Sequence, residues 1–229
     1  MSSVRGEGEN RGGGPRRRRR PEEAERAILA AARSFLSEHP FREMKVEDVM
    51  ARTGLSRPAF YAYFKDRYEL VTRLLEGIGG LLFAVDRRWL VGDPGVGREE
   101  SRAILREALR GGAETFERYG PVLRAISDAA SYDERVEEMY RFGLIERLIV
   151  AVSARISRDV EAGISPPDLV PEETARALVF MTERYLIDAY GTSTPRHTAD
   201  ATVPTLVAVW TSTLYGPTDW FEEHPGGQR

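Results

Sequence analysis

The chain has 229 residues, of which 41% are hydrophobic, with a formal net charge of −3 and no cysteine. This length and apolar content are enough for a full hydrophobic core, and the missing cysteines exclude disulfides, thiolate metal sites and cysteine nucleophiles. No uninterrupted apolar run is long enough for a membrane span, and the N-terminus is rich in Gly, Glu and Arg where a signal peptide needs apolar residues. These features predict a cytoplasmic protein.

The charge is divided unevenly along the chain. Residues 1–75 contain 16 Lys and Arg against 11 Asp and Glu, which gives +5, whereas the remainder contains 17 against 25, which gives −8. Only the first third is therefore suited to a polyanionic partner. Residues 1–20 include the run Arg16 to Arg20 and have almost no apolar side chains, so we expect a disordered basic arm. The sequence leaves open whether this arm contacts DNA or is a solubilising tail.

A first helix is expected from Pro21, because a proline followed by acidic residues is favoured at a helix start. One helical face then carries the apolar residues Ile28, Ala31, Ala32, Phe35 and Leu36. His39-Pro40 ends the pattern.

Two short helices with a turn between them are predicted next. The first runs from about Val46 to Arg52 and is stopped by Gly54, after which Ser56 is expected to cap a second helix that extends to Tyr63. Pro58 is tolerated because it lies in the first turn. This spacing is typical of a helix-turn-helix, and it predicts a DNA-binding domain at residues 21–68 in which the second short helix enters the major groove.

The rest of the chain is helical in pattern, and no convincing strand is found. Six further helices are expected at about 66–90, 98–118, 121–130, 133–161, 171–190 and 199–215, separated by glycine and proline breaks. The last of them is apolar on two sides. Its core stripe is Val203, Leu206, Val207, Trp210 and Leu214, and its other face has Ala201, Ala208 and Val209. A helix of this kind is expected to be buried by its own core and by a second subunit, which predicts a homodimer through the last two helices.

The predicted reading helix offers several groups that suit a DNA surface. Arg57 can make a bidentate contact to guanine, and Pro58 and Ala59 can contact a thymine methyl group. Tyr61 and Tyr63 can donate their hydroxyls to phosphates. Lys65 and Arg67, close to the start of the following helix, can pair with backbone charge. Phe60 and Phe64 are expected to be core residues.

The run Gly54-Leu55-Ser56-Arg57-Pro58-Ala59-Phe60-Tyr61-Ala62-Tyr63-Phe64, together with Val46-Glu47-Asp48-Val49, resembles the TetR family of transcriptional regulators. Glu114-Thr115-Phe116, Met181-Thr182-Glu183-Arg184 and the stretch from Val209 to Gly216 are similar to its EthR-like branch. This resemblance implies that residues 69–217 form a helical ligand-binding and dimerisation domain around a long apolar tunnel, followed by a tail at 218–229. It also implies that a small apolar effector releases the protein from operator DNA.

The resemblance places further residues in functional positions. Lys45 stands where the family usually has a small hydroxyl residue, so an ionic phosphate contact is expected there. The DNA-contacting set is then Lys45, Ser56, Arg57, Pro58, Ala59, Tyr61, Tyr63, Lys65 and Arg67. The implied ligand-binding set is Leu105, Gly112, Phe116, Tyr140, Val179, Thr182 and Trp210. Val179 and Thr182 replace amide side chains of the branch, and Leu105 and Gly112 replace aromatics, which predicts a shared fold with a different ligand.

Two features of the C-terminal region allow more than one interpretation. Its aromatic residues are numerous enough to line a pocket, although any one of them is more often core: Phe83, Trp89, Phe116, Tyr140, Phe142, Phe180, Tyr185 and Trp210. Gly77, Gly79 and Gly80 either provide a hinge for ligand-induced movement or allow close helix packing.

Catalysis has little support in the sequence. His39, His197 and His224 are scattered with no metal-ligand spacing and no triad, so neither an enzyme, a cofactor nor a metal site is expected. The leading hypothesis is a ligand-responsive repressor that binds a palindromic operator as a homodimer. The alternatives are a helical small-molecule-binding protein or enzyme without sequence-specific DNA binding, and an activator or nonspecific chromatin-associated protein.

Overall fold

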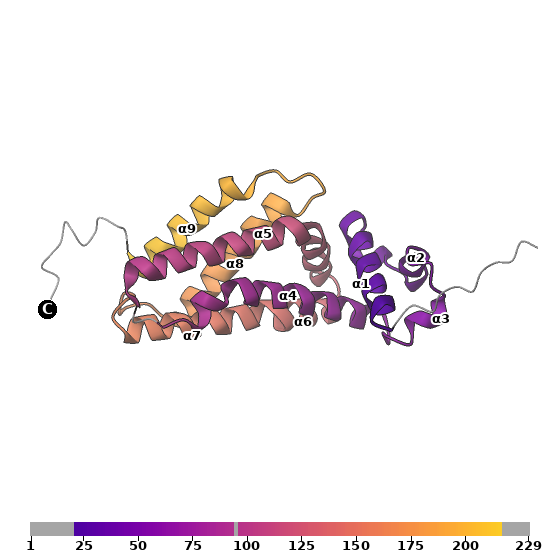
Figure 1. The fold of residues 1–229 in the computed structure, drawn as a ribbon, viewed down its shortest axis with the longest axis horizontal. Coiled ribbons are helices and arrows are strands. Elements are labelled where there is room, and N and C mark those ends of the chain that lie inside the picture. The colour runs from indigo at the N-terminus through magenta and orange to yellow at the C-terminus, as the bar shows by residue number, and fades with distance from the viewer. Residues whose placement is uncertain (1–20, 94–95, 217–229) are drawn as a thin grey trace, which may run out of the picture.

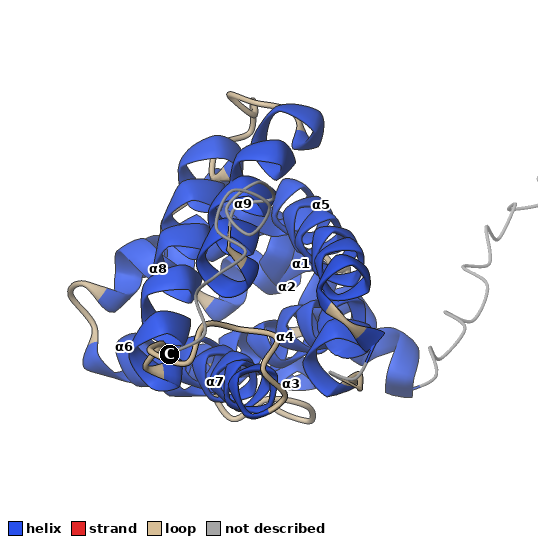
Figure 2. Ribbon diagram, turned by 90° about the vertical axis from the view of Figure 1, so that its left-hand side faces the viewer, coloured by secondary structure: helices blue, strands red, loops and turns tan. Residues whose placement is uncertain are grey.

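The computed structural model describes residues 21–93 and 96–216, and all regular elements in these ranges are helical, as predicted. The α-helices are α1 (Pro21–Glu38), α2 (Val46–Ala51), α3 (Arg57–Phe60), α4 (Arg67–Val91), α5 (Arg98–Ala130), α6 (Glu134–Tyr140), α7 (Glu146–Glu161), α8 (Pro171–Tyr190) and α9 (Ala199–Tyr215). Figure 1 shows α1 to α3 at one end of an elongated bundle formed by the other helices. Seen from the other end, these helices surround a common core (Figure 2). The expected arm at 1–20 and tail at 218–229 lie outside the described residues.

The N-terminal helices pack as their apolar patterns predict. The stripe on α1 is buried at all five predicted positions, and Val49 and Met50 of α2 lie in the same core. Phe60 and Phe64 are fully buried beside them, so their assignment to the core is confirmed. Gly54 has φ of 68°, a left-handed conformation that glycine adopts without the strain of a Cβ. It turns the chain between α2 and α3.

Helix α4 joins the two parts of the molecule. Asp66 caps it, because its carboxylate accepts hydrogen bonds from the backbone N–H groups of Tyr68 and Glu69, both at 2.9 Å. The helix then continues without interruption through its three glycines. A Cβ on Gly79 would lie 3.2 Å from Leu144 Cδ1, whereas one on Gly77 or Gly80 would meet no neighbour. Close helix packing therefore explains Gly79 but not Gly77 or Gly80. The role of these glycines as a hinge stays a prediction.

Helix α5 contradicts one predicted boundary. The sequence Tyr119-Gly120-Pro121 was expected to separate two helices, but α5 continues through it to Ala130. Gly120 lies against the end of α8, where an added Cβ would be only 2.4 Å from the carbonyl oxygen of Tyr190. This glycine therefore allows two helices to approach closely, and packing against α8 keeps α5 helical despite the proline.

The expected helix at 133–161 is also more complex than its pattern indicates. It consists of α6 and α7 with a π-helical turn, Arg141–Ile145, between them. Asp133 caps α6 by accepting hydrogen bonds from the backbone of Arg135 and Val136. Leu144 and Ile145 in the π-helical turn are buried against the bundle core. A π-helical turn shifts the register of the helix face by one residue, so it brings these two side chains to the interior.

Helices α8 and α9 occupy the predicted ranges 171–190 and 199–215. The core stripe of α9 is buried at Val203, Leu206, Trp210 and Leu214, while Val207 is half-buried. On the opposite side Ala201, Ala208 and Val209 are exposed to solvent. Asp200 is the only charged residue in α9. The predicted apolar outer face is therefore present on this helix.

Candidate functional site

The turn between α2 and α3 is held by a threonine. The Thr53 hydroxyl donates to the carbonyl oxygen of Met50 at 2.8 Å and accepts from the backbone N–H of Leu55 at 3.0 Å. Ser56 occupies the N-cap position of α3 with extended backbone, but its side chain makes no capping hydrogen bond. The predicted capping role of the Ser56 hydroxyl is therefore wrong, and Thr53 organises the turn instead.

Arg57 is the exposed first residue of α3, and Figure 1 shows this helix at the end of the molecule away from the bundle. Its Nε is 2.8 Å from a carboxylate oxygen of Glu47 on α2, and more than half of each side chain is accessible. A guanidinium N–H also donates to the Tyr61 hydroxyl at 3.4 Å. An exposed pair of this kind contributes little to stability, but it restricts where the guanidinium points.

The predicted DNA-contacting residues that follow Arg57 differ in their exposure to solvent. Pro58 is exposed and Ala59 is half-buried. The α-helical geometry of α3 ends at Phe60, earlier than predicted, so Tyr61 and Tyr63 lie on the turn that follows. Tyr61 is 51% exposed, whereas Tyr63 is half-buried and packs against the core.

Lys45 and Lys65 are exposed on either side of these two helices. Lys45 occupies the N-cap position of α2 and makes no side-chain capping bond. The backbone N–H of Lys65 donates to a carboxylate oxygen of Glu69 at 2.7 Å, which fixes the chain where α4 begins. Both ammonium groups can therefore be presented at the edges of the surface that includes Arg57.

The guanidinium of Arg67, which is predicted to pair with DNA backbone charge, makes contacts within the protein. Its guanidinium carbon lies 4.5 Å from the centroid of the Phe41 ring and 5.2 Å from that of Tyr68. One N–H donates to the carbonyl oxygen of Met44 at 3.2 Å. Arg67 therefore supports the junction of the N-terminal helices with α4, and these contacts compete with the predicted phosphate contact.

The net positive charge of residues 1–75 comes from residues 1–20. Residues 1–20 contain seven arginines and two glutamates, a net of +5, whereas residues 21–75 contain nine basic and nine acidic residues, a net of zero. Glu47 and Asp48 on α2 are among the exposed acids. Long-range attraction of residues 21–75 to a polyanion is therefore weak, and any favourable charge within this range comes from individual cations.

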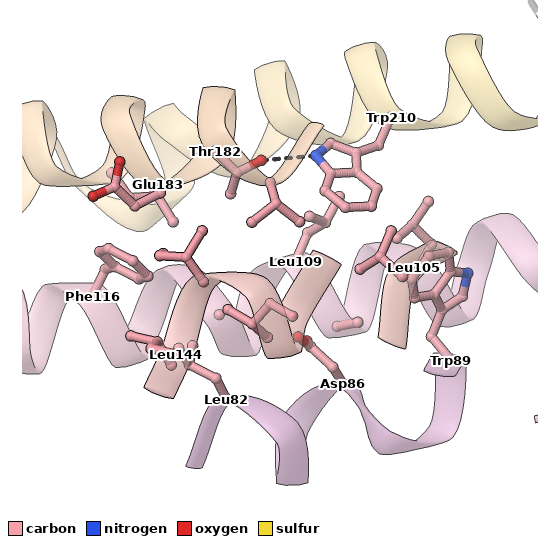
Figure 3. Close-up of a pocket in the computed structure, with 17 residues that line it drawn as sticks. Leu82, Asp86, Trp89, Leu105, Leu109, Phe116, Leu144, Thr182, Glu183 and Trp210 are labelled. Carbon is pink, nitrogen blue, oxygen red and sulfur yellow. Dashed lines mark hydrogen bonds between the residues drawn. The ribbon is translucent and has the colours of Figure 1, made fainter. Parts of the chain in front are cut away.

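A narrow cavity of about 80 Å³ lies among the helices of the bundle (Figure 3). Its wall comes from α4, α5, α7, α8, α9 and the π-helical turn. The lining residues are Leu82, Asp86, Trp89, Leu105, Ala108, Leu109, Gly112, Phe116, Leu144, Ile145, Leu148, Val152, Val179, Thr182, Glu183, Leu186 and Trp210. Most of these side chains are apolar, which suits a ligand that is largely hydrocarbon.

Six of the seven predicted ligand-binding residues belong to this wall: Leu105, Gly112, Phe116, Val179, Thr182 and Trp210. Tyr140 is not one of the lining residues. Its hydroxyl donates to a carboxylate oxygen of Glu183 at 2.6 Å, so it supports a wall residue from outside the cavity. Of the other aromatics considered, Trp89 lines the cavity, whereas Phe142 and Phe180 are 60% and 41% exposed and cannot contribute to it.

The two tryptophans of the wall are held by hydrogen bonds. Trp210 Nε1 donates to the Thr182 hydroxyl at 2.9 Å, a bond that joins α9 to α8 (Figure 3). Trp89 Nε1 donates to the Tyr215 hydroxyl at 2.9 Å, and that hydroxyl donates to Asp159, which is paired with the buried Arg155 at 2.9 Å. Burial raises the pKa of Tyr215 to about 12, so the hydroxyl stays a donor. The rings meet edge to face with centroids 5.8 Å apart.

Two acidic residues of the wall were missed by the sequence reasoning. Glu183 accepts hydrogen bonds from Tyr140 and from the Ser127 hydroxyl, and burial raises its pKa above the usual value. Asp86 points from α4 into the cavity (Figure 3), and burial raises its pKa to about 7. A signal for Asp86 exists, because it falls on the apolar stripe of α4 between Leu82 and Trp89.

The described ranges, residues 21–93 and 96–216, contain neither a metal-binding cluster nor a membrane-spanning helix. No group of three or more His, Asp and Glu side chains is placed to hold a metal ion. No helix within these ranges is both long and apolar enough to cross a membrane.

Comparison with known proteins gives matches over most of the chain. Residues 28–74 match the family model for bacterial regulatory proteins of the tetR family, and residues 105–216 match the model for the C-terminal domain of the transcriptional regulator EthR. The HTH-type transcriptional regulator EthR of Mycolicibacterium smegmatis is 29% identical over 199 residues, which cover 85% of this chain and 88% of that protein. EthR of Mycobacterium tuberculosis is 28% identical over 195 residues, with the same coverage. The solved structure of Salmonella enterica GusR has a TM-score of 0.69 at 21% identity and covers 86% of this chain and 97% of its own, which shows a shared fold.

Proposed function

The chain belongs to the TetR family of transcriptional regulators, in its EthR-like branch, and we propose that this ligand-responsive regulator binds a palindromic operator as a homodimer and leaves it when a small molecule fills the cavity. The observation that carries the proposal is the presence of two separate binding features. An exposed helix-turn-helix lies at one end, and an apolar cavity lies inside the bundle. Helix α4 belongs to both. The division between the two parts falls at about residue 68.

In the proposed complex α3 lies in the major groove. Arg57 contacts guanine, and Pro58 and Ala59 lie against thymine methyl groups. Tyr61 and Tyr63 donate to phosphates, and the exposed Lys45, Ser56 and Lys65 contact the backbone on either side. The pair with Glu47 engages Arg57 through Nε and is exposed to solvent, so guanine has to compete only with a weak contact.

The proposed dimer forms through α8 and α9. Phe180 on α8 is 41% exposed and Val209 on α9 is 37% exposed, and α9 has only Asp200 as a charged residue. Large apolar side chains in solvent on an almost uncharged helix are typical of a subunit interface. A twofold axis at this face would present two copies of α3 to successive grooves of one duplex.

The proposed coupling between ligand and DNA runs through α4. Leu82, Asp86 and Trp89 line the cavity, and the same helix begins at Arg67 beside the DNA-binding helices. A ligand shifts the equilibrium between DNA-binding and released states only by its difference in affinity for the two. An effector therefore has to fit one position of α4 better than the other.

The test of the DNA-binding function is selection of bound sequences from a random duplex library by the full chain. We expect enrichment of a twofold-symmetric site with half-sites about one helical turn apart or a multiple of it. Binding that is equally strong for all sequences would indicate a nonspecific DNA-binding protein. A lack of salt-dependent binding would favour a helical small-molecule-binding protein instead.

The dimer is tested by a charge on the proposed interface. Val209→Glu should give a monomer by analytical ultracentrifugation and should abolish binding to the selected site. Val150→Glu is a matched control, because Val150 is 67% exposed and belongs to α7, which is not one of the two helices of the proposed interface. Dimers that persist in Val209→Glu would exclude α9 as the interface.

A further inference from the structure

The charged residues of the cavity wall all have the same sign. Among its 17 lining residues Asp86 and Glu183 are acidic, and none is Lys, Arg or His. One carboxylate oxygen of Glu183, Oε1, accepts hydrogen bonds from the hydroxyls of Tyr140 at 2.6 Å and Ser127 at 3.5 Å. An anionic ligand would have to lie near these acids with no cation of the wall to offset the repulsion.

Asp86 differs from Glu183 because neither of its carboxylate oxygens has a hydrogen-bond partner in the described part of the chain. No hydrogen bond or ion pair to its carboxylate is formed there, and the rise in its pKa has desolvation as its one cause. Figure 3 shows the side chain directed into the cavity, with Leu82 and Trp89 on the same helix. Asp86 is half-buried against a mostly apolar wall, so its carboxylate has lost part of its water and gained no partner in exchange, which is unfavourable. The missing partner can come from a ligand in the cavity.

We propose that the cavity binds an amphiphile with a basic nitrogen, whose ammonium group pairs with Asp86 while its hydrocarbon part lies against Leu105, Leu109 and Phe116. The inference rests on the proposed function only in treating this amphiphile as the effector. The ammonium group supplies both the charge and the N–H donors that the carboxylate lacks, and the apolar wall excludes water from the pair. An uncharged ligand of the same shape would leave Asp86 either ionised and unpaired or protonated.

The experiment uses four probes with the same ten-carbon chain: decylamine, decyltrimethylammonium, 1-decanol and decanoic acid. Their dissociation constants are measured by calorimetry at pH 8 on the full chain without DNA, below the concentrations at which the probes form micelles. We expect decylamine to bind at least about tenfold more tightly than 1-decanol, since a close charge pair in a dry site is worth a factor of this size or more. Decanoic acid should bind most weakly.

Two variants test the role of the carboxylate. Asp86→Asn keeps the shape but removes the charge, so the preference for decylamine over 1-decanol should fall to less than about threefold while the affinity for 1-decanol stays the same or improves. Glu76→Gln is the matched control, because it removes an exposed acid from the same helix outside the cavity, and the preference should be unchanged. A thermal unfolding curve for each variant checks that it is folded.

The binding results either support or overturn the pairing of an ammonium group with Asp86. Tightest binding of decanoic acid, or an unchanged amine preference in Asp86→Asn, would overturn the proposal. Decyltrimethylammonium binding as tightly as decylamine would assign the preference to charge, and weaker binding would assign part of it to the N–H donors; both support the pairing. Failure of the probes to release the protein from its operator, despite Asp86-dependent binding, would count against the proposed ligand response and leave the binding site intact.

Discussion

All the residues expected to contact DNA lie between Lys45 and Arg67, whereas the cavity is lined by residues from Leu82 to Trp210. The first surface is made by neighbours in the sequence, and most of its side chains are exposed. The second is made by five helices and a π-helical turn, and its side chains are also the core of the bundle. An exposed residue of the first surface, such as Tyr61, can therefore be changed with little effect on folding. A residue of the cavity wall contributes both to ligand binding and to the stability of the fold.

The strongest test of this difference is a large deletion on each surface. Trp210→Ala should lower the free energy of unfolding by about 3–5 kcal/mol, because it removes a buried ring and its hydrogen bond to Thr182. Tyr61→Ala should lower it by less than about 1 kcal/mol, since half of that side chain is already in solvent. Urea unfolding at several protein concentrations measures both. If the two variants lost similar amounts of unfolding free energy, the proposed difference between the DNA surface and the cavity wall would be wrong.

The pH dependence of stability gives the next largest effect. The folded chain raises the pKa of Asp86 to about 7 from an ordinary value of 3.8, so the folded state holds a proton that the unfolded state releases between these pH values. Stability from this group therefore falls as pH rises from about 4 to about 7. Asp86→Asn should lose that dependence and gain about 2–3 kcal/mol over wild type between pH 5 and pH 8. Parallel stability curves for the two proteins would contradict this burial effect.

Changes on the DNA side should alter recognition with folding unaffected. Arg57→Ala should lose about 1–3 kcal/mol of discrimination at one base pair of each half-site. Lys65→Ala should instead weaken all sequences equally and reduce the salt slope by about one. Fluorescence titrations against single-base variants of the selected site measure both. An unchanged base preference in Arg57→Ala would refute its assignment to guanine.

The smallest effect distinguishes two neighbouring hydroxyls in the turn. Thr53→Ala should cost about 1 kcal/mol of stability, because it removes the bonds to Met50 and Leu55. Ser56→Ala should stay within about 0.5 kcal/mol, since the Ser56 side chain makes no capping bond. Thermal unfolding of the two variants side by side is sufficient. A larger cost for Ser56→Ala would restore the capping role that the sequence indicated.

Much of the candidate DNA surface could be predicted because its geometry depends on residues a few positions apart. The buried stripe of α1, the turn at Gly54 and the core positions of Phe60 and Phe64 all follow from local periodicity and backbone preference. Contacts between residues that are far apart in the sequence could not be predicted in this way. The contact of Arg67 with Met44 joins residues 23 positions apart, and no pattern within one helix reveals it.

The sequence by itself determined the all-helical class, most helix ranges, the helix-turn-helix and the apolar outer face of α9, since each depends on a repeat along a single segment. Only the tertiary structure decided that α5 continues past Pro121 and that Tyr140 lies behind the cavity wall. It also decided that the carboxylate of Asp86 has no partner among the described residues. These outcomes depend on which distant helices meet and how closely. That information arises only when the chain is packed, because burial and pairing are properties of neighbours in space.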